Sequence, residues 1–363
     1  MMMQNNLHFL DRKIIEINTN KLIHNYKIIK KRSSNAEILC VVKGDAYGHG
    51  LIECSSKLYS HGVKNFYVAR IDDAIRLRNQ FKSINIYLLA GVISRSDTEE
   101  IFKKKIIPII NNFEQLQLIK KIKKSPIKFV IHADTGMNRL GFQNNEMDKL
   151  FQSTNSNQIL SIISHLSSSD EKNEIESLWQ LKQLKLFNRL FQKPLSLCNS
   201  AGIFLNKKLH LDFVRPGKSL YGINPFPGKT FDLKPVMSIY APILQVSKIK
   251  RGVTVGYAKT FKAKKNMKIA TVDFGYSDGL HRIASNKGKV FIDDLACPIL
   301  GRISMDLITI DVSHIDQNKL YLGRPVEILG KNQSYESLAN DNSTNEHEIL
   351  ISLGKNSKKY FLD

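Results

Sequence analysis

Short apolar runs alternate with amphipathic stretches from residue 36 onward. Runs such as residues 37–42 have the length and composition of buried strands, and stretches such as residues 51–59 have the period of an amphipathic helix. The predicted strands are residues 37–42, 65–69, 85–90, 106–110, 127–131, 159–164, 195–198 and 211–214, with helices between them that include residues 51–59, 72–79, 113–122 and 174–191. Eight such units in about 180 residues favour an α/β fold, a (β/α)8 TIM-type barrel. A doubly wound sheet, the alternative, usually has fewer strands and a Gly-rich first turn.

The pattern changes near Asn224. A Pro- and Gly-rich stretch, residues 224–228, is followed by runs of β character with little helical periodicity. These runs are residues 242–249, 268–273, 289–292, 308–312 and 325–329. We therefore expect two domains, a barrel over residues 1–235 and a mostly β C-terminal domain over residues 236–363.

Composition adds a strongly basic charge. The 54 lysines and arginines outnumber 33 acidic residues, which gives a formal net charge of +21 at pH 7. Only 13 of the basic residues are arginine, whereas bidentate reading of bases and phosphates favours arginine. The scattered lysines indicate a solvated surface, and we expect no nucleic-acid partner. Steeply salt-dependent retention by DNA would contradict this expectation.

The cysteines and the apolar runs bear on location. Cys40, Cys54, Cys198 and Cys297 have no CxxC spacing, so neither a zinc ribbon nor a disulfide framework is indicated, and no metal site is expected. No apolar run approaches the roughly 18 residues of a membrane span, and the N-terminus lacks a signal-peptide pattern. A cytoplasmic protein without a membrane partner is predicted.

Polar residues follow five of the predicted barrel strands. The carboxyl ends of barrel strands form one mouth, where active sites lie. The residues at these ends are Lys43 after the first strand, the segment 132–142 with Arg139 after the fifth, His165 after the sixth, Asn199 and Ser200 after the seventh, and Arg215 and Gly217 after the eighth. We expect these side chains to converge.

Lys43 is the candidate nucleophile. Its ammonium group stands at the end of an apolar run, where desolvation lowers the pKa and makes the amine usable for a Schiff base. A lysine that simply extends to solvent is the alternative. The glycines at positions 44, 48 and 50 favour the functional interpretation, because they let the backbone approach a bound group.

The other strand ends supply what pyridoxal phosphate needs. Ser200 and the amides around Gly217 and Lys218 can hold a phosphate. Arg215 can reach the pyridine nitrogen, and Arg139 either the ring hydroxyl or a substrate carboxylate. His165 can line the ring or orient an arginine. Each residue alone has a structural alternative, such as a simple turn at Asn199.

Residues 42–50, VKGDAYGHG, closely resemble the pyridoxal-phosphate attachment motif of alanine racemases. Further segments resemble motifs of that family in the same order along nearly the whole chain. They are residues 134–141, 198–201, 214–217, 220–222, 255–261, 274–279 and 301–306.

The resemblance implies an isomerase that interconverts L- and D-alanine and supplies D-alanine for peptidoglycan. Pyridoxal phosphate would be attached to Lys43, which also acts as base on the D enantiomer, while Tyr257 acts on the L enantiomer. Because a free tyrosine has a pKa near 10, Tyr257 needs a cationic neighbour, and Arg215 and His165 are the candidates. The expected cofactor contacts are Lys43, Tyr47, His165, Asn199, Ser200, Arg215, Gly217 and Lys218.

The resemblance also implies a homodimer whose active site is shared between subunits. Tyr257 and the backbone at Met305 would come from the partner subunit. Arg139 and Met305 would bind the substrate carboxylate, and Tyr276 would restrict the pocket to small side chains. Without the motifs, a tyrosine packed in a β core is an equal interpretation of Tyr257 and Tyr276.

The chain departs from the family pattern at two places. His132 stands where many members have a lysine that becomes carbamylated and orients the motif arginine, so what holds Arg139 is open. Residues 354–360 also differ from the family's C-terminal pattern. Two other functions stay open: a racemase of other small amino acids such as serine, and a non-catalytic pyridoxal-phosphate carrier, which would lack the β domain.

Overall fold

The computed structural model describes residue 10 and residues 12–122, 126–171, 174–226, 228–229, 231–355 and 358–363. Their packing divides the chain into two compact units. One consists of residues 22–46 and 51–234, and we call it the barrel unit. The other consists of the described residues up to Lys21, residues 47–50 and residues 235–363, and we call it the β-rich unit.

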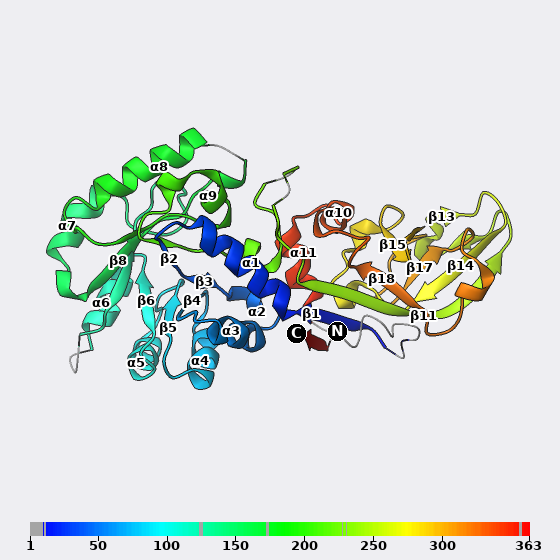
Figure 1. Cartoon of the computed structure of the whole chain (residues 1–363), viewed down its shortest axis with the longest axis horizontal. Helices are drawn as coiled ribbons and strands as arrows, with labels where there is room; N and C mark the ends of the chain where they lie inside the picture. Colours follow the sequence, from blue (N-terminus) through cyan, green and yellow to red (C-terminus); the bar gives the residue numbers. More distant parts are fainter. Residues whose placement is uncertain are drawn as a thin grey trace. The chain divides into compact units, whose positions relative to one another are not determined.

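The barrel unit is a closed parallel sheet (Figure 1). Its strands, in spatial order, are β2 (Glu37–Ile38), β10 (Phe213–Val214), β9 (Leu195–Ser196), β8 (Ile159–Ile163), β7 (Phe129–His132), β6 (Ile107–Ile110), β5 (Asn85–Leu88), β4 (Asn65–Val68) and β3 (Cys40–Val41). Only Leu39 separates β2 from β3, and its amide donates to the Val214 carbonyl at 2.9 Å. Residues 37–41 therefore act as one strand that closes the sheet, and the predicted (β/α)8 barrel is confirmed.

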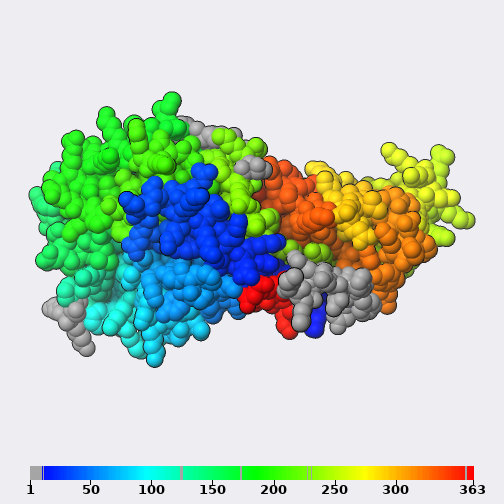
Figure 2. All heavy atoms as spheres, in the orientation of Figure 1, coloured from blue at the N-terminus to red at the C-terminus, as the bar shows by residue number. Residues whose placement is uncertain are grey.

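Helices connect most of these strands. They are α1 (Thr19–Arg32), α3 (Leu51–Ser60), α4 (Ile71–Gln80), α5 (Arg95–Lys103), α6 (Phe113–Lys120), α7 (Met147–Gln152), α8 (Glu174–Phe187) and α9 (Ser200–Leu205). Polar caps fix several starts, since the side chains of Ser94 and Asn112 accept from the amides of Asp97 and Gln115. The helices predicted over residues 113–122 and 174–191 end earlier, at Lys120 and Phe187. In Figure 2, α3 and α4 form part of the unit's surface.

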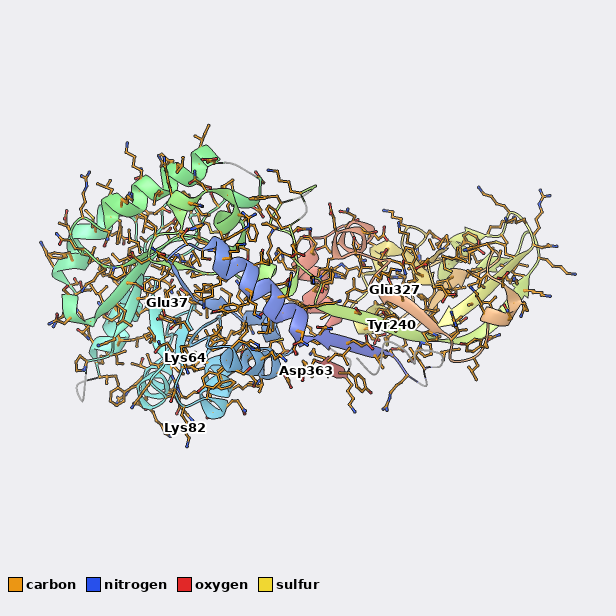
Figure 3. The ribbon with its side chains drawn as sticks, in the orientation of Figure 1. Glu37, Lys64, Lys82, Tyr240, Glu327 and Asp363 are labelled. Atoms are coloured by element: carbon orange, nitrogen blue, oxygen red, sulfur yellow. The ribbon has the colours of Figure 1, made fainter. Side chains whose placement is uncertain are left out.

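Polar side chains form a ladder at the beginning of the first three barrel strands. Asn65 donates to the Glu37 carboxylate, and Asn85 donates to the Asn65 carbonyl oxygen at 2.8 Å. Glu37, labelled in Figure 3, is exposed at the start of β2. This ladder lies at the end of the barrel opposite the carboxyl ends of the strands, so it is structural rather than part of the predicted site.

The β-rich unit is built on an antiparallel and mixed sheet. Its order is β16 (Leu295–Pro298), β15 (Lys289–Ile292), β18 (Pro325–Leu329), β11 (Met237–Ile249), β1 (Ile14–Asn18) and β19 (Lys359–Leu362), and β11 also pairs with β14 (Met267–Val272), which pairs with β17 (Ile308–Asp311). Tyr240 and Glu327 are partners across β11 and β18 (Figure 3). The helices α10 (Tyr335–Asp341) and α11 (Glu346–Leu353) were not predicted, but the mostly β character is confirmed.

Two segments of the predicted domain 1–235 are packed in the β-rich unit. Strand β1 pairs with β11 and β19, and residues 47–50 pack against α11. A Cβ on Gly48 would lie 2.4 Å from the Leu350 carbonyl oxygen, and one on Gly354 would lie 2.1 Å from the Gly48 oxygen. Only glycine permits so close an approach of the two backbones. Because β1 and residues 47–50 both pack in the β-rich unit, this unit is discontinuous in sequence.

Candidate active site

Lys43 begins a short left-handed turn. Gly44, Asp45 and Ala46 have φ values of 63°, 54° and 55°, a conformation that costs roughly 1–2 kcal/mol for each non-glycine residue. The Asp45 carboxylate accepts from the Leu51 amide at 2.9 Å and so spans the turn. Such strain is typical of functional sites, where surrounding structure enforces it. Here it fixes the backbone that presents Lys43.

Lys43 is half-buried in a positive environment. Desolvation lowers the pKa of its amine, and the nearby Arg139 and Arg215 guanidinium groups lower it further. Among the described residues, the Lys43 ammonium has no hydrogen-bond partner. A neutral amine is a nucleophile, so this environment suits covalent chemistry with a carbonyl compound.

Arg215 is a buried cation with neutral partners. It is 5% exposed and donates to Ser196 Oγ at 2.5 Å and to the carbonyl oxygens of Ser164 and Leu197. The guanidinium carbon lies 5.9 Å from the ring centroid of Tyr67, whose buried hydroxyl has no hydrogen-bond partner among the residues that the structure describes. A buried charge without a counter-ion and a buried hydroxyl without a partner both indicate a place for a polar, anionic ligand.

The ends of β9 and β10 meet at Ser200. Its hydroxyl oxygen accepts from the amides of Gly217 at 2.9 Å and Ser219 at 3.2 Å. The Asn199 side chain caps α9 by accepting from the Gly202 amide at 3.0 Å. The structure thus brings together Ser200, Gly217 and Lys218 as predicted from the strand ends, but the Gly217 amide is engaged by Ser200 rather than free for a phosphate.

Arg139 lies in a loop after β7. One carboxylate oxygen of Asp134 accepts from the amides of Gly136, Met137 and Asn138, and two backbone hydrogen bonds to Phe142 close the base of the loop. In the part of the chain that the structure describes, the exposed Arg139 guanidinium has no hydrogen bond or ion pair. It is available to an incoming anion.

Two histidines lie at the same edge. The His165 pKa is far below its usual value because of desolvation first and then the charges of Arg215, Arg139 and Lys43. The His165 carbonyl oxygen accepts from Gln180 Nε2 at 3.0 Å. His132 Nδ1 lies 2.7 Å from Asn111 Oδ1. Because its imidazole is neutral, His165 does not supply the cationic neighbour that a tyrosine base needs.

Sequence reasoning missed four residues of this region: Tyr67, Asn111, Gln115 and Gln180. Asn111 directly follows β6, so the strand-end rule that identified Lys43 would also have found it. The other three lie within β4, α6 and α8 and carried no signal in the sequence.

Tyr47 belongs to the β-rich unit. Its ring packs edge-on to the His347 ring of α11 with centroids 6.5 Å apart, and burial raises the pKa of its hydroxyl to about 12. The structure thus places this predicted cofactor contact against α11.

Three motifs of the β-rich unit lie side by side. The Tyr276 and Ser277 amides donate to the carbonyl oxygens of Ser304 and Met305, and Gly256 contacts the Arg302 backbone. Tyr257, Tyr276 and Met305 are 67%, 42% and 56% exposed, which is high for large apolar side chains. None of these three side chains is packed in the core of the β-rich unit.

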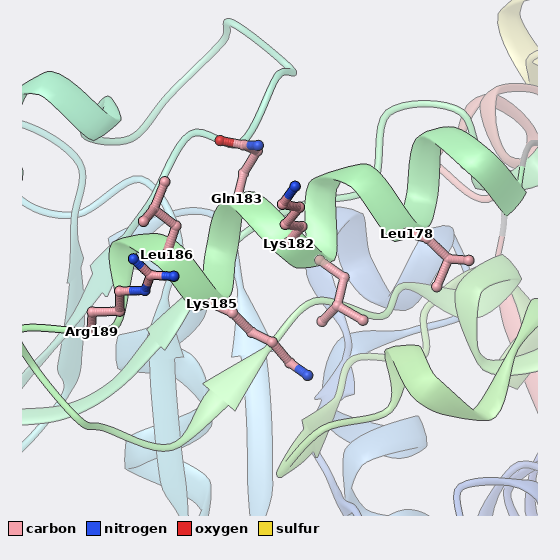
Figure 4. A pocket seen from close by; sticks show the side chains of 7 residues that line it. Leu178, Lys182, Gln183, Lys185, Leu186 and Arg189 are labelled. Carbon is pink, nitrogen blue, oxygen red and sulfur yellow. The ribbon is translucent and has the colours of Figure 1, made fainter.

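A separate pocket lies on the outer face of α8 and contains none of the predicted site residues. Its lining includes Leu178, Lys182, Gln183, Lys185 and Leu186 of α8 and Arg189 of the turn that follows α8 (Figure 4). Among the helices that the structure describes, none is long and apolar enough to cross a membrane.

Comparison with known proteins identifies the family. Residues 17–225 match the model described as "Alanine racemase, N-terminal domain", and residues 236–361 match "Alanine racemase, C-terminal domain". An alanine racemase of Rickettsia canadensis is 35% identical over 355 residues, 96% of this chain and 98% of the relative, and one of Rickettsia bellii is 37% identical over 91% of this chain and 82% of the relative.

Solved structures agree with these matches. Alanine racemase from Bartonella henselae, described with covalently bound pyridoxal phosphate, has a TM-score of 0.91 and 34% identity and covers 97% of this chain and 99% of its own. The enzyme from Acinetobacter baumannii has a TM-score of 0.89 at 31% identity, with 97% and 99% covered. The resemblance drawn from the motifs is confirmed, and the chain belongs to the alanine racemase family.

Proposed function

We propose that the protein is a pyridoxal-phosphate-dependent alanine racemase that supplies D-alanine for peptidoglycan. The observation that carries the proposal is the group of positive charges at the barrel mouth. Burial and the charges of Arg139 and Arg215 lower the pKa of Lys43, and neither arginine has a carboxylate partner among the described residues. Such a site favours a ligand with a phosphate, a carbonyl that reacts with an amine, and a substrate carboxylate.

The residues fit pyridoxal phosphate. Lys43 would hold the carbonyl carbon, and Arg215 would donate to the pyridine nitrogen. Ser200 and the backbone at Gly217 and Lys218 would form the phosphate end, while the unpartnered Tyr67 hydroxyl marks unfilled polar space beside Arg215. His165, Asn199 and Tyr47 complete the proposed cofactor contacts. When bound, the cofactor makes the substrate's Cα proton acidic by withdrawing electron density from it.

The chain's own groups move the proton. Racemisation removes the Cα proton on one face and returns it on the other, so two bases on opposite faces are needed. Lys43 Nζ is the proposed base for D-alanine and Tyr257 Oη the one for L-alanine. Arg139 and the Met305 backbone would hold the substrate carboxylate, and Tyr276 would limit the side chain to a methyl group.

The covalent role of Lys43 has a direct test. Borohydride reduction of the holoprotein followed by peptide mass analysis should locate the cofactor on Lys43. Lys43→Ala should abolish both this adduct and racemisation. Tyr257→Phe should keep the adduct and slow exchange of the Cα proton of L-alanine more than that of D-alanine. Retention of activity in Lys43→Ala would refute the mechanism.

The proposal includes a homodimer in which Tyr257 and Met305 serve the partner's Lys43. It is supported by the exposed apolar side chains of the β-rich unit, Tyr257, Tyr276, Ile283, Met305 and Leu307, which need cover. The barrel domain, residues 1–235, would then hold the cofactor, and residues 236–363 would supply the second base. The four cysteines are free and buried, which supports a reducing, cytoplasmic setting.

Mixing two inactive variants tests the shared site. When Lys43→Ala and Tyr257→Phe subunits are unfolded and refolded together, half of the dimers are mixed, and each mixed dimer has one intact site of two. Activity should return to roughly a quarter of the wild-type value. No recovery would mean that Tyr257 serves its own subunit. Leu307→Glu should weaken the dimer in sedimentation, whereas Leu322→Glu, also exposed, should not.

A further inference from the structure

Three buried amide and imidazole side chains lie at the carboxyl ends of β6 and β7. Asn111, Gln115 and His132 are 3%, 7% and 6% exposed. Asn111 follows β6, Gln115 lies in the first turn of α6, and His132 is the last residue of β7. Because buried polar groups must find partners, their hydrogen bonds can be followed one by one.

The Asn111 amide group is oriented by its neighbours. Asn111 Nδ2 lies 3.2 Å from the Leu89 carbonyl oxygen and 3.1 Å from that of Ile109, so these atoms accept from it. Gln115 Nε2 donates to the Ala90 carbonyl at 2.8 Å, which leaves Gln115 Oε1 to accept from the Asn111 backbone amide at 2.9 Å and from Nδ2 at 3.1 Å. Asn111 Oδ1 therefore faces His132 as an acceptor.

This orientation determines the tautomer of His132. Nδ1 lies 2.7 Å from Asn111 Oδ1, so Nδ1 must carry a proton. Desolvation and the charge of Arg215 lower the pKa of His132 to about 4, with Asp134 opposing and Arg139 adding to the shift. The imidazole is therefore neutral near pH 7, and its Nε2 presents a lone pair.

The loop that carries Arg139 is tied to His132. The Phe142 amide donates to the His132 carbonyl at 2.8 Å, and a Cβ on Gly141 would lie 2.9 Å from the same oxygen. The charge of Arg139 also lowers the pKa of His132, so the guanidinium is within electrostatic range of the ring, although no hydrogen bond joins the two side chains in the described structure. A guanidinium has only donors, so it needs an acceptor, and Nε2 is an acceptor without a hydrogen-bond partner among the described residues.

We propose that His132 is a positioning residue whose Nε2 accepts a hydrogen bond from Arg139 and aims the guanidinium at the substrate carboxylate. The inference rests on the proposed function. Asn111 and Gln115 act behind His132 by holding the imidazole in the tautomer that leaves Nε2 unprotonated. A protonated His132 would repel Arg139 and release it.

Replacing Asn111 by aspartate gives a sharp test. In Asn111→Asp a carboxylate faces Nδ1, which raises the pKa of His132 toward 7. The KM for alanine should then rise about tenfold between pH 8 and pH 6, because one pH unit is a tenfold change in protonation, while kcat changes little. The wild type should show no such rise, since its His132 stays neutral over this range. An unchanged KM profile in the variant would overturn the proposal.

Replacing His132 itself gives a rescue series. Gln can accept through Oε1 and cannot titrate, so in His132→Gln the KM should stay within about threefold of the wild type. His132→Leu should raise KM at least about tenfold with the cofactor still attached to Lys43. His210, shortly before β10, is a buried histidine whose Nε2 lies 3.0 Å from the Ile203 carbonyl oxygen. His210→Gln is the matched control. Equal effects of Gln and Leu at position 132 would overturn the acceptor role.

A measurement without turnover separates this inference from the proposed function. Nitrogen NMR of histidine-labelled protein, assigned with His132→Gln, should show a neutral His132 with its proton on Nδ1 from pH 5.5 to 8.5. A proton on Nε2 or an imidazolium would refute the inference even if the enzyme racemises alanine. If the proposed function is wrong and Lys43 takes no cofactor, the wild-type protein alone will show this.

Discussion

At the scale of single residues, the candidate site contains positive charges without a counter-charge among the described residues. Desolvation lowers the pKa of Lys43, and repulsion by the Arg139 and Arg215 charges lowers it further. The same repulsion makes an anionic ligand stabilising, because it supplies the missing negative charge. The pKa of Lys43 thus depends on the charges of its neighbours.

Removing the charge of Arg139 should make Lys43 more basic. In Arg139→Gln the pH midpoint for attachment of pyridoxal phosphate to the apoprotein should move upward, because less repulsion leaves the ammonium form more stable. A shift of half a unit would slow attachment at pH 7 about threefold. The midpoint is read from absorbance at several pH values, and Arg189→Gln, in the turn after α8, is the control. A midpoint that falls would contradict the assigned electrostatics.

Strand-end reasoning predicted most residues of the candidate site but not the side chains that orient them. Lys43, His165, Ser200 and Arg215 were found because each directly follows an apolar run. The hydrogen bonds that orient His132 depend on Leu89, Ala90 and Ile109 carbonyl oxygens, which belong to neighbouring strands. Sequence spacing carries no information on such contacts, and the left-handed turn at Asp45 is equally invisible.

At the scale of elements, Arg78 joins three segments of the barrel. It leaves α4 and donates to the carbonyl oxygens of five residues: Phe81, Lys82, Ile84, Lys104 and Lys105. These carbonyls lie just before β5 and β6, where the chain turns into the sheet. The fork of one guanidinium therefore satisfies backbone groups that no helix or strand can pair.

Replacing Arg78 should destabilise the barrel far more than replacing an exposed arginine. A lysine cannot reproduce the fork, so Arg78→Lys should cost about 2 kcal/mol of the free energy of unfolding, measured in urea. Arg95→Lys, at a solvent-exposed pair with Glu99, should change it by less than about 0.5 kcal/mol. Equal costs would show that the five hydrogen bonds add nothing.

Strand β1 contains a carboxyl group in an unfavourable place. Glu16 is 2% exposed, and its Oε1 has no hydrogen-bond partner within the described part of the chain. Burial raises its pKa above the ordinary 4.5, against the opposing charge of Lys21. The folded protein thus binds a proton more tightly than the unfolded chain does. Its stabilisation is full below pH 4.5 and is lost as the pH rises through the folded-state pKa.

Glu16→Gln should therefore become more stable than the wild type as the pH rises. The variant does not titrate at this position, so the difference in unfolding free energy should grow between pH 5 and pH 8 and reach about 1 kcal/mol. Urea unfolding at four pH values measures it. Glu53→Gln, an exposed carboxylate on α3, should give a flat difference. A difference in unfolding free energy that shrinks as the pH rises would contradict the predicted direction of the Glu16 pKa shift.

Helices and strands could be predicted from the sequence where the pattern of hydrophobic and polar residues was local. The eight barrel strands repeat the same alternation of run and helix, and all eight were found. Strand β1 was missed because Ile14–Asn18 is short and its partners, Met237–Tyr240 and Lys359–Leu362, are remote in sequence. The α11 helix was missed because its buried face, with Ile349, Leu350 and Leu353, covers only two turns.

At the scale of the whole molecule, the β-rich unit is held by its C-terminal strand. Strand β19 runs parallel to β1, and the Thr19 hydroxyl donates to the Leu362 carbonyl and the Asp363 carboxylate at 3.1 and 2.8 Å. Residues 356–357, within the segment that departs from the family pattern, lie outside the described residues, but β19 itself is a regular strand.

Deleting residues 359–363 should expose an edge of β1. The loss of a strand's hydrogen bonds should lower the free energy of unfolding by about 3 kcal/mol and promote association through the open edge. Thermal unfolding and light scattering measure the two effects. Phe361→Ala keeps the backbone pairing and should cost less. A deletion that leaves both readings unchanged would show that β19 is dispensable.

The pairing of β1 with β19 also sets an order of events during synthesis on the ribosome. Thr19 and Asp363 are 344 residues apart, so one edge of β1 stays unpaired until β19 has been made, whereas its other edge can pair with β11 once that strand emerges. Residues 22–46 and 51–234, which form the barrel, emerge before β11 and can close while β1 is still single. Until β11 emerges, the nascent β1 has no strand partner, and chaperones that bind such segments would meet it first.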